Sequence, residues 1–357
     1  MEGFSVIVLV PCVNEAGSIR ATLQALMAQT RKPDGIIVGD HNSTDGTGEI
    51  ARTLGVTVVT CQSPIKRKGA NLQNMFQSQE FRQMVGNHPR ERVIVVIIDG
   101  DTIVDQRGLE NLVRVFEDPQ VTSASGYVLP AKVNCIWQKA RLFEYHLSLN
   151  LHKRIQAGFG SSLVCSGCFA GIRLNVLLDT GGFGIDLSED LILTWEQLTK
   201  GQQVRFVPEA LCYTQEPTSL GMVLRQLDRW GRGFFQGVAK YKRQILSFTN
   251  PSFSIFVLFW LLEGIIAPFL PLITLITTIK FGLGFLKIVV IVTAMYEFAI
   301  TVMPAAIGSY KHGHLLATMC SLPYFSLLRL VAMFAWWRAM WKEWIVREHL
   351  PEWHKGH

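Results

Sequence analysis

The sequence lacks most features of secreted, zinc-binding and repetitive proteins. No basic stretch precedes the apolar run at 4–10, so no signal peptide is predicted, and membrane insertion is expected to depend on later segments. The 7 cysteines are scattered, and the close pair Cys165 and Cys168 has no second pair to complete a zinc site. Buried, reduced thiols are therefore expected. Internal repeats and low-complexity linkers are also missing from the sequence.

Strong charge of one sign is missing as well. The formal net charge is +6, and a small basic excess beside apolar segments fits anionic lipid headgroups better than nucleic acid. No nucleic-acid partner is therefore expected. Apolar residues are abundant instead, at 49% of 357 residues. They are concentrated between residues 253 and 341, whereas residues 1–250 have the composition of an ordinary mixed α/β sequence.

Short β-branched runs alternate with helical patterns in the first hundred residues. Strands are predicted at 4–10, 35–38, 56–60 and 93–98, with helices at 18–30 and 47–54. Buried strands that alternate with helices form a mostly parallel sheet, whose ligands lie at the carboxyl ends of the strands. The expected fold is therefore α/β, with helices on both faces of the sheet.

Three apolar windows follow residue 250, each near or above the roughly 20 residues needed to cross a bilayer. They are 253–279, 281–307 and 314–341, and we interpret them as about three transmembrane or membrane-embedded segments. The charged residues within them are expected to face protein or water; they are Glu263, Lys287, Glu297 and Arg329. Pro268 and Pro271 make the first window the candidate for a kinked or re-entrant segment.

Two segments mix aromatic and basic side chains in a helical pattern. The first, 136–157, suits a helix that lies in the membrane interface, with an ordinary domain helix packed on the sheet as an equally good alternative. The second, 220–246, would lie at the level of the lipid headgroups.

Two carboxylates follow the predicted strand at 93–98, where Asp99 and Asp101 flank Gly100. Hard carboxylate oxygens in a tight turn suit Mg²⁺ or Mn²⁺ that bridges a diphosphate. This D-x-D spacing is common on its own. Its position after a buried strand is what favours a metal site.

A second polar turn, 39–47, also follows a strand and can close around a nucleoside. Asp40 is placed to accept a hydrogen bond from a uracil N3–H, whereas Asp45 and Thr47 are expected only to cap the next helix. The basic stretch 66–68 puts Lys68 where a pyrophosphate would lie, with a solvated basic loop as the alternative.

Six motifs follow one another along the first 240 residues. In chain order they are Pro11 with Asn14-Glu15, Asp40 to Thr47, Lys68 to Leu72, Asp99-Gly100-Asp101, Ser188-Glu189-Asp190 and Gln226-x-x-Arg229-Trp230. This order resembles family 2 glycosyltransferases of the GT-A fold. More narrowly, it is similar to the processive synthases of cellulose, hyaluronan, chitin and poly-N-acetylglucosamine. The most specific stretch begins at Ser166-Gly167, passes Gly181-Gly182-Phe183 and ends at Trp230.

The resemblance implies a role for each matching residue on the donor side. Glu15 and Asp40 would hold the nucleoside. Asp99 and Asp101 would bind the diphosphate and a Mg²⁺ or Mn²⁺ ion, and Asp190 would be the general base that takes a proton from the acceptor hydroxyl.

On the acceptor side, the resemblance implies that Gln226, Arg229 and Trp230 line the acceptor and pyrophosphate site. Residues at i, i+3 and i+4 share one face of a helix, which agrees with this grouping. Trp230 would offer a flat apolar face to a sugar ring.

The implied function is inverting transfer of a sugar from a UDP-sugar, with UDP-N-acetylglucosamine or UDP-glucose favoured, to a growing β-linked polysaccharide at the membrane. The expected partners are the donor, a saccharide acceptor and the lipid bilayer, and the resemblance leaves room for accessory membrane subunits. The alternatives are a non-processive transferase that makes a lipid-linked or short glycan, and a membrane scaffold with a degenerate transferase domain. Because nucleotide sugars are cytosolic, the catalytic domain of this integral membrane protein is expected in the cytoplasm.

The sequence departs from the family pattern in two residues and in its N-terminal region. His41 stands where a second acid often follows Asp40, and Ser188 stands where Thr is commoner. Spans before the catalytic domain are not predicted, so a self-contained polymer channel is not expected. The expected division is a GT-A catalytic domain at 1–218, an acceptor-site and interfacial segment at 219–250, membrane-embedded segments at 251–341 and a polar tail at 342–357.

Overall fold

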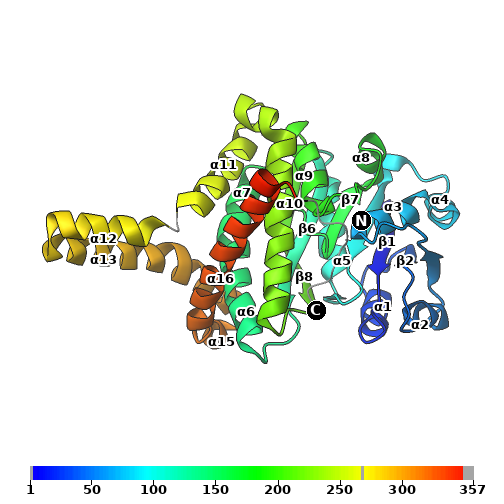
Figure 1. Ribbon diagram of the computed structural model, residues 1–357. Helices are drawn as coiled ribbons and strands as arrows, with labels where there is room; N and C mark the ends of the chain where they lie inside the picture. Colours follow the sequence, from blue (N-terminus) through cyan, green and yellow to red (C-terminus); the bar gives the residue numbers. More distant parts are fainter. Residues whose placement is uncertain (1–2, 267–268, 349–357) are drawn as a thin grey trace.

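A computed structural model of the protein describes residues 3–266 and 269–348, and shows an α/β domain joined to C-terminal helices (Figure 1). The strands, in chain order, are β1 (Ser5–Cys12), β2 (Gly35–Asp40), β3 (Thr57–Thr60), β4 (Val93–Ile98), β5 (Ile103–Val104), β6 (Val121–Pro130), β7 (Phe169–Arg173) and β8 (Gln203–Thr214). They form one sheet in the order β3-β2-β1-β4-β7-β6-β8-β5.

The sheet is mixed and mostly parallel, as predicted. The neighbouring pairs among β3, β2, β1 and β4 are parallel, and so are β6 and β8. β7 lies antiparallel between β4 and β6, and β5 lies antiparallel beside β8. The carboxyl ends of β1, β2 and β4 therefore meet at one edge, where the polar turns follow them.

Helices cover both faces of the sheet because the central strands are apolar on both sides. Alternate residues of β1 point to opposite faces: Val8 packs in a cluster with α1 (Ile19–Met27) and α5 (Gly108–Arg114). Leu9 packs on the other face, with α3 (Lys68–Gln77), α4 (Gln79–Val85) and α8 (Leu174–Asp179). All eight residues of β1 are buried, which explains its unbroken apolar pattern.

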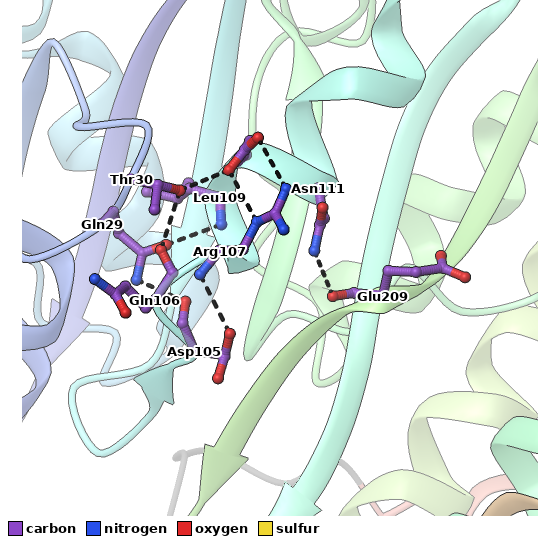
Figure 2. A network of polar contacts seen from close by, with 9 residues as sticks. Gln29, Thr30, Asp105, Gln106, Arg107, Leu109, Asn111 and Glu209 are labelled. Atoms are coloured by element: carbon purple, nitrogen blue, oxygen red, sulfur yellow. Dashed lines mark hydrogen bonds and ion pairs between the residues drawn. The ribbon is translucent and has the colours of Figure 1, made fainter. Parts of the chain in front are cut away.

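A polar network fixes the segment that follows the turn at residues 99–101 (Figure 2). The Gln29 side-chain amide, just beyond α1, donates to the Asp105 carbonyl at 2.8 Å and accepts the Leu109 backbone N–H at 3.0 Å. The Asn111 amide donates to the Glu209 carbonyl on β8 at 2.7 Å. The chain after the acidic turn is thereby tied to α1 on one side and to β8 on the other.

The segment predicted at 136–157 is helical. It comprises α6 (Ile136–Ser148), a π-helical turn (Leu149–Lys153) and α7 (Arg154–Gly158). Phe143 on α6 is fully buried and stacks on Phe325 of a C-terminal helix, with ring centroids 4.7 Å apart. Much of α6 is thus enclosed by protein, and its placement in a membrane interface stays a prediction.

Two further helices complete the region around the sheet. They are α9 (Glu189–Thr199) and the long α10 (Leu220–Ser247). Trp195 of α9 is fully buried against Phe234 of α10 and Phe253 beyond it, with edge contacts to both rings. This aromatic cluster packs α9 against α10.

The C-terminal helices are α11 (Pro251–Ile266), α12 (Leu270–Phe281), α13 (Leu283–Glu297), α14 (Met303–Lys311), α15 (Leu315–Met319) and α16 (Leu322–Met340). α12 and α13 form a hairpin that projects away from the rest of the protein, whereas α16 packs against α6 and α10 (Figure 1). A π-helical segment (Phe298–Val302) joins α13 to α14, and this continuous helix, Leu283–Lys311, is the one among the described residues that can cross a membrane by length and composition. Pro251–Ile266 is a shorter apolar helix, and the number of spans stays a prediction.

Two sequence predictions for this region concern individual residues. Glu297 and Arg329, the charges of separate apolar windows, form an ion pair at 2.9 Å, in which the Arg329 side chain stays 51% exposed. Pro268, one of the two prolines expected to kink the first window, lies outside the described residues, as does the tail from residue 349 onward.

Candidate active site

A cleft of about 470 Å³ lies at the carboxyl end of β4, between the sheet, the α6 to α7 segment, α9 and α10. It brings together residues from four distant motifs. The predicted site residues that line it are Lys68, Asp99, Asp101, Asp190, Gln226, Arg229 and Trp230. Glu15 follows β1, and Asp40 is the last residue of β2. Both lie at the same edge of the sheet but do not line the cleft.

The acidic turn is held against β1 by its glycine. A Cβ at Gly100 would lie 2.7 Å from the Cys12 sulfur and 3.2 Å from Glu15 Cγ, so a side chain does not fit there. The Thr22 hydroxyl donates to the Gly100 carbonyl at 3.0 Å. Asp101 is buried, and burial raises the pKa of Asp99, against the opposing effect of the nearby Lys68 ammonium.

Lys68 begins α3 and reaches into this acidic turn. Its ammonium lies 2.6 Å from Asp99 Oδ1 and 3.7 Å from Glu189 Oε1, and it donates to the Gly167 carbonyl at 2.9 Å. Burial lowers the pKa of Lys68, but the carboxylates around it outweigh burial and leave that pKa above its usual value. Lys68 is therefore a charged part of the cleft and not a solvated loop residue.

Asp190 lies in the first turn of α9, opposite Lys68 across residues 166–168. The backbone N–H groups of Gly167 and Leu191 donate to its two carboxylate oxygens at 3.1 and 2.8 Å. These bonds fix the direction of the carboxylate. Burial raises the pKa of the neighbouring Glu189 to about 7.

The face of α10 predicted from the i, i+3, i+4 spacing does point into the cleft, since Gln226, Arg229 and Trp230 all line it. Trp230 is 38% exposed, which leaves ring surface available to a ligand. The Arg229 Nε is buried and makes no hydrogen bond to any residue that the structure describes. An unsatisfied donor beside the acidic turn suits an oxyanion that arrives with the substrate.

The turn at 39–47 is cross-linked to the chain after β1. Thr47 Oγ1 accepts the Glu15 N–H at 2.7 Å, and the Glu15 carboxylate accepts the Ser18 hydroxyl at 2.9 Å. Asp40 accepts the Ser43 N–H at 3.0 Å. Asp45 accepts the Thr47 N–H at 3.1 Å just before α2 (Thr47–Thr53), but the N-cap residue is Gly46 and makes no side-chain cap bond, so the capping predicted for Asp45 and Thr47 is limited to this one hydrogen bond.

Sequence reasoning missed the wall of the cleft opposite the acidic turn. Trp260 of α11 and Trp336 of α16 line it, together with Glu144 and Glu216. Lys153, in the π-helical turn, also lines it and donates to the Ser166 hydroxyl at 2.8 Å, and burial lowers its pKa. The mixed aromatic and charged pattern of 136–157 was the available signal for Glu144 and Lys153, and no motif marked Trp260, Trp336 or Glu216.

The residues of the acidic turn fit a hard divalent cation. Two carboxylates, Asp99 and Asp101, face the cleft from one tight turn. No group of three or more His, Cys, Asp or Glu side chains suited to a metal occurs among the described residues. Mg²⁺ in nucleotide sites is commonly held by one or two carboxylates plus substrate phosphates, which agrees with this donor set.

A sequence profile described as "Glycosyltransferase like family 2" matches residues 4–233, well over half of the chain. Poly-β-1,6-N-acetyl-D-glucosamine synthase of Staphylococcus aureus is 26% identical over 229 residues, which cover 63% of this chain and 53% of that protein. The synthase of the same name from Staphylococcus epidermidis is 24% identical over 241 residues, 65% of this chain and 55% of that protein. The chain thus spans about half the length of the curated relatives it matches.

Among solved structures, the mannosyltransferase PcManGT of Pyrobaculum calidifontis, in complex with GDP-Man and Mn²⁺, aligns with a TM-score of 0.61 at 21% identity. The alignment covers 96% of this chain and 88% of that chain. At this identity the likeness speaks for the fold, which is the GT-A type expected from the motifs.

Proposed function

The chain belongs to glycosyltransferase family 2, and from this premise we propose that it is an inverting enzyme that transfers a sugar from a UDP-sugar to a growing β-linked saccharide at the membrane. One observation carries the proposal. A single cleft is lined by Asp190, by Asp99 and Asp101 of the acidic turn with Lys68, and by the Gln226, Arg229 and Trp230 face of α10.

On the donor side, Glu15 and Asp40 would bind the nucleoside, and Asp99 and Asp101 would hold Mg²⁺ or Mn²⁺ against the diphosphate. The metal would supply Lewis-acid stabilisation of the negative charge on the departing UDP. Lys68 and the unsatisfied Nε of Arg229 add positive charge at the same place.

Asp190 would act as the general base. A sugar hydroxyl is a weak nucleophile, so a carboxylate must take its proton as the hydroxyl oxygen bonds to the anomeric carbon. The N–H groups of Gly167 and Leu191 orient the carboxylate but leave further lone pairs to accept that proton. Attack on the face opposite UDP inverts the anomeric carbon and gives a β-linkage from an α-linked donor.

UDP release by the purified, detergent-solubilised protein tests the proposal. The donors to compare are UDP-N-acetylglucosamine, which the names of the relatives favour, UDP-glucose and GDP-mannose, each with β-linked oligosaccharide acceptors. Long products indicate processive synthesis, and addition of one or a few sugars indicates a non-processive transferase. Failure to release UDP from either UDP-sugar or GDP from GDP-mannose, with correctly folded protein, would support the alternative of a membrane scaffold with a degenerate transferase domain.

A second candidate is transfer to a lipid-linked acceptor, and one observation favours it. Trp260 and Trp336, which line the cleft, belong to the C-terminal helices α11 and α16, and α11 precedes the exposed apolar hairpin of α12 and α13 in the chain. An acceptor with an apolar tail could approach along this wall. Product extraction into organic solvent in the same assay separates a lipid-linked product from a water-soluble one.

We also propose that the protein is integral to the membrane, with its catalytic domain in the cytoplasm. The exposed apolar side chains of α13, such as Ile288, Val292 and Met295, support membrane insertion of the hairpin. The test is a cysteine at Asn87, in a variant without the exposed Cys320. An impermeant thiol reagent should label it only after cells are opened, and labelling in intact cells would overturn the orientation.

A further inference from the structure

Arg141 lies in the middle of α6 with a fully buried side chain and does not itself line the cleft. Its guanidinium nevertheless contacts two residues that do. One terminal nitrogen donates to Gln226 Oε1 at 2.5 Å, and the guanidinium carbon lies 4.9 Å from the centroid of the Trp230 ring. Arg141 is thus bound to both ends of the acceptor face of α10.

Two acidic side chains face the guanidinium of Arg141. Glu144, one turn further along α6, forms an ion pair with its other terminal nitrogen. Glu216, just beyond β8, lies 3.6 Å from the Arg141 Nε and accepts the Tyr145 hydroxyl at 2.6 Å. Each nitrogen of the planar guanidinium therefore faces a different partner, an arrangement that the single ammonium of lysine cannot reproduce.

The contacts decide what Gln226 and Trp230 present to a ligand. Because Gln226 Oε1 accepts from Arg141, the amide nitrogen of Gln226 is the atom left to donate to a ligand oxygen. Because the guanidinium covers one face of the Trp230 ring, the opposite face is the one left for a sugar ring. Both choices would be lost if Gln226 and Trp230 were free to rotate.

We propose that Arg141 is a positioning residue of the acceptor site, which sets Gln226 as a hydrogen-bond donor and fixes one face of Trp230 for the acceptor sugar. The inference rests on the proposed transferase function and deepens it. Arg141 acts through these two side chains and touches neither substrate, so its loss should affect the acceptor and spare the donor.

The experiment compares Arg141→Lys with the wild type in kinetics and in binding. Arg141→Lys keeps the buried positive charge opposite Glu144 and Glu216 but cannot hold Gln226 and Trp230 together. We expect the acceptor KM, and the Kd for a β-linked oligosaccharide by calorimetry, to rise about tenfold. The donor KM, the Kd for UDP and the slow release of UDP without acceptor should stay at wild-type values.

Two further variants separate positioning from general stability. Arg154→Lys is the matched control, because Arg154 lies on α7, is exposed and does not line the cleft; it should leave the acceptor KM unchanged. Gln226→Met should raise the acceptor KM by itself, and adding Arg141→Lys to it should cost less than the product of the two single effects.

The outcomes distinguish the inference from the function it rests on. An active wild type whose acceptor KM is unchanged by Arg141→Lys would overturn the positioning role, and so would an equal loss of donor binding and acceptor binding. A wild type that binds neither UDP nor oligosaccharide would reject the transferase function and, with it, the role of Arg141.

Discussion

The two sides of the cleft are built in different ways. The nucleotide half consists of β1 to β4 with α1 to α4. Its carboxylates lie at or just after the ends of separate strands, so the sheet brings Glu15, Asp40 and Asp99 to one edge. The acceptor half consists of α6, β8, α10 and α16. Its polar contacts join residues that are far apart in sequence. Arg141 and Gln226 are 85 positions apart, and Arg338 and Asp228 are 110 positions apart.

The difference has a functional consequence. Proteins with the same sheet can share a nucleotide site that the strand ends assemble. An acceptor site that depends on contacts between helices can change when a few buried charged residues are replaced. Asp190 lies where the halves meet, because α9 packs on α10 and its carboxylate is oriented by Gly167, which also accepts from Lys68. Perturbations placed in one half or at the junction should therefore have separable effects.

Metal removal should have the largest effect and act on the nucleotide half alone. We expect transfer to be lost in excess chelator and restored by Mg²⁺ or Mn²⁺, because Asp99 and Asp101 cannot bind a diphosphate without a cation between them. Asp101→Ala should weaken UDP-sugar binding and leave oligosaccharide binding intact, measured by calorimetry. Full activity in chelator would show that the acidic turn works without metal.

Asp190→Asn should be next in size and act at the junction. The amide keeps the shape of the side chain but cannot accept the acceptor proton, so kcat should fall on the order of 10²-fold or more while the Kd for UDP stays unchanged. Single-turnover transfer and UDP titration measure the two quantities. Turnover close to the wild-type rate would remove Asp190 from the role of general base.

The same contrast explains what the sequence could predict. β1 and β4 were expected at 4–10 and 93–98 and are found at Ser5–Cys12 and Val93–Ile98, because uninterrupted apolar runs bounded by polar turns identify buried strands. β6 was missed because Ser123 and Ser125 break its apolar pattern, although both are fully buried in the sheet. The antiparallel insertion of β7 between β4 and β6 depends on pairing that no local pattern encodes.

For the site, the motifs led to the residues that line the cleft on α10 but not to what holds them. The spacing of Gln226, Arg229 and Trp230 shows that they share a helix face. Nothing in the spacing shows that Arg141 lies behind that face, because the contact depends on how α6 packs against α10. Glu216 was likewise not predicted, because it follows β8, a strand that was not predicted.

The ion pair between Arg232 and Glu343 tests the acceptor half by stability. Arg232 on α10 is fully buried and lies 2.5 Å from Glu343, which follows α16. Glu343→Gln leaves a buried guanidinium without its counter-charge and should lower the free energy of unfolding by about 3 kcal/mol.

The matched control is Glu49→Gln, which breaks an exposed pair with Arg52 on α2, and should cost less than about 1 kcal/mol. Denaturant titration of the protein in detergent compares the two variants. Equal losses would show that burial of the pair between Arg232 and Glu343 does not add to its stabilising effect.

The smallest predicted effect is the pH dependence of the free energy of unfolding. It involves one buried carboxyl group on each side of the junction between the two halves. Burial raises the pKa of Glu216 to about 7, and burial raises that of Glu189 to about 7 as well. Both folded-state values lie above the usual glutamate value, so the folded protein keeps protons that the unfolded chain releases as pH rises from about 4.5 to 7. The free energy of unfolding should therefore fall as pH rises across this window. Glu216→Gln should remove only about half of this pH dependence, because Glu189 still contributes.

Denaturant midpoints at pH 5, 6 and 7 measure the pH dependence of the free energy of unfolding. A pH dependence unchanged by Glu216→Gln would show that Arg141 keeps the carboxyl group of Glu216 ionised at pH 5 in the folded protein.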